Sequence, residues 1–148
     1  MLPKTILVPT DFSDSSDFAL AYAVKLARSL GAELVVLHTY ELPMIGFPDG
    51  TLVATAELTS RVLDGARVAL DAAVAKHGNA GVPLRTLVKE GESWRTIVDA
   101  APEVGAGLIV MGTHGRSGLP RALLGSVAEK VVRMAPCPVL TVHATPEP

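Results

Sequence analysis

The chain has 148 residues, of which 49% are hydrophobic, and carries a formal net charge of −2. This length suits one compact domain and is short for two, so we expect a single domain over residues 1–148. A near-neutral charge without a basic cluster argues against nucleic-acid binding. No apolar run approaches the roughly 20 residues of a membrane span, and residues 1–4 lead into no signal-peptide core. We therefore expect a cytoplasmic protein without nucleic-acid or membrane partners.

Apolar runs alternate with helical periodicity along the first half of the chain. Residues 6–8 predict a short buried strand. The helix expected next ends at Gly31, and its start offers three capping side chains, Asp11, Ser13 and Asp14. Residues 34–37 predict a second apolar strand, and residues 56 to about 77 predict the longest helix because one face is apolar.

The second half continues the alternation. Residues 82–88 predict a third strand, and a helix follows from about residue 93. The continuous apolar run 106–111 is typical of a strand covered on both faces. Residues 126–134 predict the last helix and residues 139–142 the last strand. Strand and helix patterns thus alternate five times, which predicts an α/β protein with a parallel sheet and helices on both faces.

The loop between the apolar run 106–111 and the last helix is the most informative segment. Its glycines are Gly112, Gly115, Gly118 and Gly125. Glycine lets the main chain approach a ligand closely, and the unpartnered N–H groups at a helix start favour a phosphate. Ser126 adds a hydroxyl, and Arg116 and Arg121 could neutralise more distal phosphates. The loop is neither a Walker A element nor a Rossmann fingerprint, and from spacing alone a structural turn explains it equally well.

The spacing of this loop resembles the ATP-binding signature of the universal stress protein family: Gly, two residues, Gly, nine residues, Gly-Ser. Residues 4–13, 32–40 and 135–142 are each similar to blocks of the same family, whereas residues 42–50 are the least similar part. The resemblance implies a single doubly wound five-stranded parallel sheet with strand order 3-2-1-4-5. Its ligand crevice would lie at the switch between the first and fourth strands.

The resemblance also implies which residues contact a nucleotide. Asp11 would accept a hydrogen bond from a ribose hydroxyl or an adenine amino group, although a helix cap is its alternative role. Thr39 would border adenine at a commonly aliphatic position, where its polarity predicts slightly weaker packing of the base. Pro9 and Thr10 would form a wall for the base, and Met111 and Val127, unless they are plain core residues, would contact the ribose and phosphates. The residues expected to hold the phosphates are Gly112, His114, Gly115, Gly125 and Ser126, with the charge of Arg116 directed to more distal phosphates. An ordinary neutral loop histidine is an equal alternative for His114.

The other histidines and the single cysteine are assigned structural roles. We expect His38 to be a satisfied structural residue, His77 to lie at an exposed helix end and His143 to lie on the last strand. Cys137 lies between two prolines and is expected to be a packing residue. No two histidines have metal-ligand spacing, so we expect no intrinsic metal site.

These features predict an ATP- or adenine-nucleotide-binding stress-response module that acts through nucleotide occupancy and dimer contacts. Mg²⁺ could arrive with ATP, held mostly by phosphate oxygens and water. The resemblance implies a homodimer through antiparallel pairing of Val139–Val142, which a lysine in place of Val139 or Leu140 should dissociate. No catalytic residue is assigned, since no nucleophile elbow is present. Two alternatives stay open: a weak ATP hydrolase or phosphate-transfer enzyme that depends on Asp11 or His114, and a nucleotide-free dimerisation adaptor.

Overall fold

The computed structural model describes residues 1–42, 44–78, 81–114 and 123–144. Its centre is a five-stranded parallel sheet in the order β5-β2-β1-β6-β7. The strands are β1 (Thr5–Pro9), β2 (Glu33–Tyr40), β5 (Leu84–Glu90), β6 (Leu108–Gly112) and β7 (Val139–Val142). Along the chain these are the first, second, third, fourth and fifth strands of the sheet, so the expected order 3-2-1-4-5 is confirmed.

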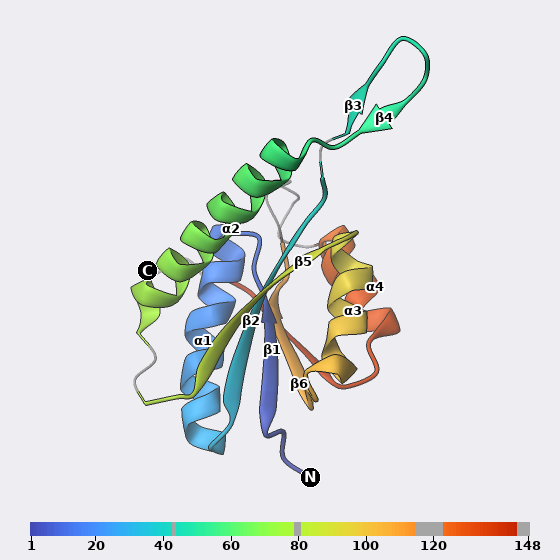
Figure 1. The fold of residues 1–148 in the computed structure, drawn as a ribbon. Coiled ribbons are helices and arrows are strands. Elements are labelled where there is room, and N and C mark those ends of the chain that lie inside the picture. The colour runs from blue at the N-terminus through green and yellow to red at the C-terminus, as the bar shows by residue number, and fades with distance from the viewer. Residues whose placement is uncertain (43, 79–80, 115–122, 145–148) are drawn as a thin grey trace.

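Helices cover both faces of the sheet (Figure 1). The described part of the chain contains four of them: α1 (Asp14–Leu30), α2 (Ala56–His77), α3 (Ser93–Glu103) and α4 (Ser126–Met134). α1 and α2 share one apolar cluster with the sheet, and α3 and α4 share a second cluster on the opposite face. The expected doubly wound α/β fold is therefore confirmed. None of the described helices is both long and apolar enough to cross a membrane.

The central strand β1 shows why the sequence predicts buried strands without polar alternation. All five of its residues are buried. Ile6 and Val8 pack into the cluster beneath α1 and α2, whereas Leu7 packs into the cluster beneath α3 and α4. Successive side chains of a strand point to opposite faces, so a strand covered by helices on both faces is apolar at every position.

Several strand boundaries differ from the sequence expectation, including those of β2 and β5. β2 continues past the apolar run 34–37 to Tyr40, and β5 covers Leu84–Glu90 instead of residues 82–88. The two strands pair in register from Leu34 with Leu84 to Tyr40 with Glu90. The ends of these strands are determined by backbone pairing with the neighbouring strand, which cannot be predicted from the length of the apolar run.

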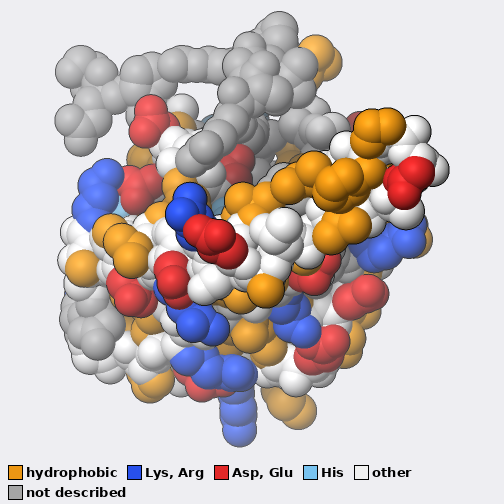
Figure 2. All heavy atoms as spheres, turned by 45° about the horizontal axis from the view of Figure 1, so that its top comes forward, with side chains coloured by type: hydrophobic (Ala, Val, Ile, Leu, Met, Phe, Trp, Pro, Cys, Tyr) orange, Lys and Arg blue, Asp and Glu red, His pale blue; other side chains and the backbone are white. Residues whose placement is uncertain are grey.

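A small antiparallel hairpin, β3 (Ile45–Gly46) and β4 (Leu52–Val53), was not expected from the sequence. Its turn is stabilised by Asp49, whose Oδ1 accepts a hydrogen bond from the Thr51 backbone N–H at 2.9 Å, and by Gly50 with φ +86°. Figure 1 shows the hairpin extending away from the sheet. Apolar side chains gather on its surface in Figure 2, and the exposed ones are Met44, Ile45, Phe47, Leu52 and Val53.

The expectation that His77 lies at an exposed helix end is wrong. Its side chain is only 17% exposed, and Nε2 lies 2.6 Å from Oδ1 of Asp17. Lys76 Nζ donates to the other carboxylate oxygen of Asp17 at 2.8 Å. The last turn of α2 therefore packs against the first turn of α1, a contact between helices that the sequence does not reveal.

Candidate functional site

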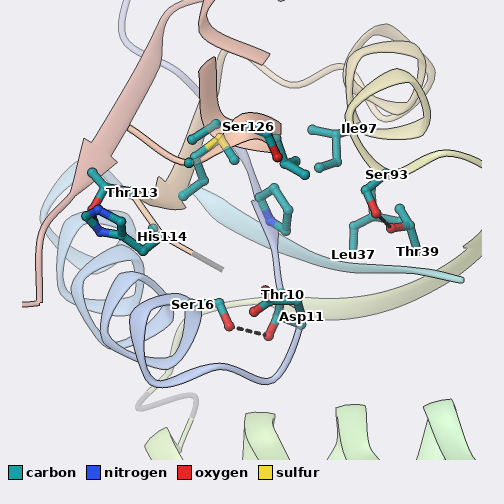
Figure 3. Close-up of a pocket in the computed structure, with 16 residues that line it drawn as sticks. Thr10, Asp11, Ser16, Leu37, Thr39, Ser93, Ile97, Thr113, His114 and Ser126 are labelled. Atoms are coloured by element: carbon teal, nitrogen blue, oxygen red, sulfur yellow. Dashed lines mark hydrogen bonds between the residues drawn. The ribbon is translucent and has the colours of Figure 1, made fainter. Parts of the chain in front are cut away.

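A cavity of about 330 Å³ opens at the carboxyl ends of β1, β2 and β6, where the strand order reverses (Figure 3). This volume and position are typical of ligand sites in open α/β sheets. Ten residues that we expected at a nucleotide site line it: Pro9, Thr10, Asp11, Thr39, Met111, Gly112, His114, Gly125, Ser126 and Val127. The other two, Gly115 and Arg116, lie outside the described residues, as do Gly118 and Arg121.

Sequence reasoning missed several residues that line the same cavity. These are Ser16, Leu37, Ser93, Ile97, Thr113 and Ala128. From the sequence, Leu37 and Ile97 are expected to be core residues, because Leu37 belongs to an apolar strand and Ile97 to the apolar face of a helix. Ser93 lies at the expected start of a helix, where the sequence gives no sign of a ligand contact. Only the packing of α3 against β2 brings these side chains to the cavity.

The loop from β1 into α1 forms one wall of the cavity and is held by several hydrogen bonds. The carbonyl of Thr10 accepts from His38 Nδ1 at 2.9 Å, so this ring nitrogen carries a proton. The Thr10 hydroxyl accepts from the Phe12 N–H at 3.1 Å and bonds the Ser16 hydroxyl at 3.1 Å. His38 is thus a satisfied structural residue, as the sequence predicts.

Phe12 has a strained backbone in this wall. Its φ is +63°, in the left-handed region that bulky side chains rarely adopt. The Phe12 ring lies 4.4 Å from the His38 ring, between centroids, and this contact helps to hold the loop. Such strain costs free energy and is concentrated at functional sites in proteins, where the surrounding structure enforces it.

Asp11 has a local hydrogen bond but is not the helix cap. The N-cap of α1 is Ser13, whose side chain accepts from the Ser16 N–H. Asp11 Oδ1 accepts from the Ser13 N–H at 3.0 Å. A carboxylate has two oxygens, and Asp11 lines the cavity, so it can also accept a bond from an occupant.

Gly112 ends β6 beside α1. A Cβ on this residue would lie 2.4 Å from the Ser15 Oγ and 2.8 Å from the Ser15 backbone C and O. The glycine is therefore required by the close approach of α1 to β6, irrespective of any ligand. This is a structural reason for Gly112 beyond the phosphate contact inferred from the sequence.

A hydroxyl joins two histidines beside the start of the glycine loop. Thr113 Oγ1 lies 2.9 Å from His114 Nδ1 and 3.1 Å from His143 Nδ1, and Thr113 is 1% exposed. A hydroxyl has one proton, so at least one of these imidazoles donates from Nδ1. His143 lies one residue beyond β7 and not on it. The Gly125 N–H donates to the Thr113 carbonyl at 2.7 Å, which joins the two described ends of the loop.

Two helices begin at the cavity. The first residues of α3 and α4, Ser93 and Ser126, both line it. Their N-caps, Glu92 and Gly125, make no side-chain capping hydrogen bond. The first N–H groups of a helix lack partners within the helix and carry partial positive charge, so this arrangement can bind an anion.

Two observations on the described side chains concern metal binding and a possible cysteine nucleophile. No group of three or more His, Cys, Asp or Glu in that part of the chain is placed to hold a metal ion. Cys137 is half-buried and packs against the cluster beneath α3 and α4. Burial raises the pKa of its thiol, which disfavours the reactive thiolate, in keeping with the packing role expected for it.

Sheet topology and cavity together define a doubly wound α/β protein with a ligand-sized site at the switch in strand order. The model of the family described as "Universal stress protein family" matches residues 3–143. The chain therefore belongs to the universal stress protein family.

Relatives and solved structures agree with this assignment. The chain is 38% identical to universal stress protein MJ0531 of Methanocaldococcus jannaschii over 143 residues, 95% of this chain and 82% of the relative. It is similar to the solved structure of the hypothetical protein MJ0577, with 25% identity, a TM-score of 0.78, and 97% and 98% of the two chains covered.

Two further similar structures are nucleotide complexes. A universal stress protein from Archaeoglobus fulgidus in complex with dAMP has 28% identity and a TM-score of 0.68, covering 95% of this chain and 98% of that one. A universal stress protein in complex with cAMP has 29% identity and a TM-score of 0.62, and the match covers 98% of this chain and 100% of that chain.

Proposed function

We propose that this protein binds an adenine nucleotide in the cavity at the switch in strand order and acts in the stress response through nucleotide occupancy. The observation that carries the proposal is the convergence on one cavity of the β1–α1 loop, the two described ends of the glycine loop and the starts of α3 and α4. The family membership and the dAMP and cAMP complexes of two similar proteins support the same ligand class.

In this proposal the two ends of the cavity have different roles. The phosphates lie against the start of α4, where the backbone N–H and hydroxyl of Ser126 and the side chain of His114 can donate hydrogen bonds, while the Gly125 N–H is already bonded to the Thr113 carbonyl. Asp11 accepts a hydrogen bond from a ribose hydroxyl. The base lies toward Leu37 and the strand end of β2. With ATP as the ligand, Mg²⁺ would be held mainly by phosphate oxygens and water.

The proposal is tested first on the purified protein. Nucleotide released on denaturation is identified by mass spectrometry, and the emptied protein is titrated calorimetrically with ATP, ADP and AMP, with and without Mg²⁺. Adenine nucleotide binding supports the proposal. The absence of bound nucleotide together with the absence of binding contradicts it and favours a nucleotide-free dimerisation adaptor, whereas multiple turnover of ATP favours a hydrolase.

Substitution of Asp11 tests the proposed ribose contact. Asp11→Asn keeps a carbonyl oxygen for the Ser13 N–H but removes the charge, so we expect nucleotide affinity to fall about tenfold, the usual worth of a charged hydrogen bond. Asp14→Asn is the matched control, because Asp14 is an exposed residue of the same segment that does not line the cavity. Equal affinity of wild type and Asp11→Asn would contradict this role.

A further inference from the structure

Three side chains form a hydrogen-bonded chain that links the end of β7 to the cavity. Oγ1 of Thr113 lies 3.1 Å from Nδ1 of His143 and 2.9 Å from Nδ1 of His114. Thr113 and His114 line the cavity, and Figure 3 shows their side chains next to each other at one side of it. His143 is exposed and is not one of the lining residues. It therefore reaches the cavity only through Thr113.

The register of the sheet explains why His143 lies beside Thr113. β6 and β7 are parallel and stay in register to the last residue of each strand. Thr113 and His143 are the residues that follow these two strands, so the same register brings them together. The His114 backbone is fixed from the other side, because its N–H donates to Oγ of Ser15 in α1 at 3.3 Å. The hydrogen bond from Thr113 then restrains the ring of His114.

The Thr113 hydroxyl has one proton to share between two imidazoles. Thr113 is 1% exposed, and within the described part of the chain its hydroxyl bonds to His114 and His143. A buried hydroxyl whose proton has no acceptor is unfavourable. Thr113 therefore donates to one imidazole and accepts from the other, which gives the chain of hydrogen bonds two possible directions.

The direction of the chain decides which nitrogen of His114 carries the proton. If His143 donates from Nδ1, Thr113 donates to Nδ1 of His114, and a neutral His114 then carries its proton on Nε2. In the opposite direction His114 carries its proton on Nδ1, and its Nε2 is an acceptor. Phosphate oxygens are acceptors at neutral pH. Only the first direction therefore lets a neutral His114 donate to a phosphate from Nε2.

We propose that His143 is a positioning residue of the nucleotide site, which acts through the Thr113 hydroxyl to hold His114 in the tautomer protonated on Nε2. The inference rests on the proposed nucleotide function and adds to it a residue that does not touch the ligand. It gives His143, for which the sequence predicts a structural role alone, a part in phosphate binding. It also connects the phosphate end of the cavity to the end of β7.

The first test reads the tautomers directly. Long-range ¹H–¹⁵N NMR of protein labelled with ¹⁵N-histidine, at about pH 8 where an ordinary imidazole is neutral, identifies the protonated nitrogen of each ring. We expect His114 to be protonated on Nε2 and His143 on Nδ1. Single substitutions assign the signals, since each removes the signals of one ring. A wild-type His114 protonated on Nδ1 would overturn the inference.

Substitution of His143 tests the same chain of hydrogen bonds. His143→Ala removes the donor to Thr113, so we expect His114 to become a mixture of tautomers. His143→Asn is the matched control, because its side-chain N–H can replace the Nδ1–H of histidine, and it should keep the wild-type tautomer. Both changes are mild for the fold, since position 143 is exposed and lies outside the sheet.

The second test measures AMP affinity by calorimetry. We expect His143→Ala to weaken binding about threefold and His143→Asn to bind as the wild type does. In a His114→Ala background, His143→Ala should have no further effect, because a positioning residue acts through the residue it positions. A merely structural role of His143 would weaken binding equally in both backgrounds.

The outcomes separate this inference from the proposed function. If the wild type does not bind AMP, the proposed function fails and the inference fails with it. If the wild type binds AMP but His143→Ala binds equally well, or weakens binding equally without His114, nucleotide binding stands and the positioning role of His143 is excluded.

Discussion

Gly112 contributes both to the packing of α1 against β6 and to the lining of the candidate site. It lies at the carboxyl end of β6 and lines the cavity, yet its missing Cβ is required by Ser15 of α1. Two of the atoms too close to that Cβ belong to the Ser15 backbone, which cannot rotate away as the end of a flexible side chain can. A substitution here therefore acts on the fold before it acts on any ligand.

We expect Gly112→Ala to lower the free energy of unfolding by about 2 kcal/mol or more, as overpacking of a rigid contact does. Urea denaturation measures the change. Gly65→Ala is the control: Gly65 lies within α2, and its Cβ would meet no atom within 4 Å. Alanine at position 65 should raise the free energy of unfolding by about 0.5 to 1 kcal/mol. Similar effects of both substitutions would contradict the packing argument.

At the scale of secondary-structure elements, Asp17 connects α1 to α2. Its carboxylate bonds Lys76 at 2.8 Å and His77 at 2.6 Å. Burial alone raises the pKa of Asp17, but the hydrogen bonds and charges of Lys76 and His77 outweigh it, and the net pKa is below the ordinary value of 3.8. The same contact raises the pKa of Lys76. The ion pairs thus stabilise the ionised carboxylate in the folded protein.

The pH dependence follows from the lowered pKa of Asp17. The stabilisation is complete above the unfolded-state value and is lost as pH falls through the lower folded-state value. We expect Asp17→Asn to reduce the free energy of unfolding by about 1 kcal/mol at about pH 6 and by nearly nothing at about pH 2.

Denaturant titrations at both pH values measure this difference. Asp64→Asn, which alters an exposed carboxylate of α2, serves as the control and should change stability little at either pH. A destabilisation by Asp17→Asn that is the same at both pH values would show that the ion pairs with α2 are not its cause.

At the scale of the whole molecule, β7 is an edge strand of the sheet, because β6 is its one partner among the described residues. The Pro138 carbonyl accepts from the Ile109 N–H at 3.0 Å and so faces β6. Alternation along a strand then directs the backbone groups of Val139 and Thr141 to the side of β7 away from β6. We propose that this edge pairs with a second copy of the chain, since an uncovered apolar edge favours such pairing.

Thr141→Pro tests the proposed dimer. Proline removes an edge donor without removing a bond to β6, so we expect a folded monomer in sedimentation velocity, with Thr141→Val as the dimeric control. A lysine at Val139 or Leu140 is less selective, because both side chains pack against the core clusters. A monomeric wild type, or an unchanged dimer of Thr141→Pro, would contradict the proposal.

Much of the fold could be predicted because each regular element has a local cause. Apolar runs predict the buried strands, and the 3.6-residue apolar period and Gly31 predict α1, whose C-cap has φ +65°. The hairpin β3–β4 was missed because each strand has only two residues, too few for a period to show. Likewise, His77 could not be placed without the packing of α2 on α1.

By itself, the sequence determined the alternation of strands and helices along the chain and the parallel sheet, because these depend on local periodicity and on the positions of turns. The family resemblance of its motifs indicated the strand order in the sheet and most of the site residues at the carboxyl ends of β1 and β6. The tertiary structure alone decided that Ser93 faces Thr39, that Gly112 meets Ser15 and that Asp17 binds the end of α2. Each of these contacts joins residues far apart in the chain, and their distance depends on how whole elements pack rather than on any local pattern.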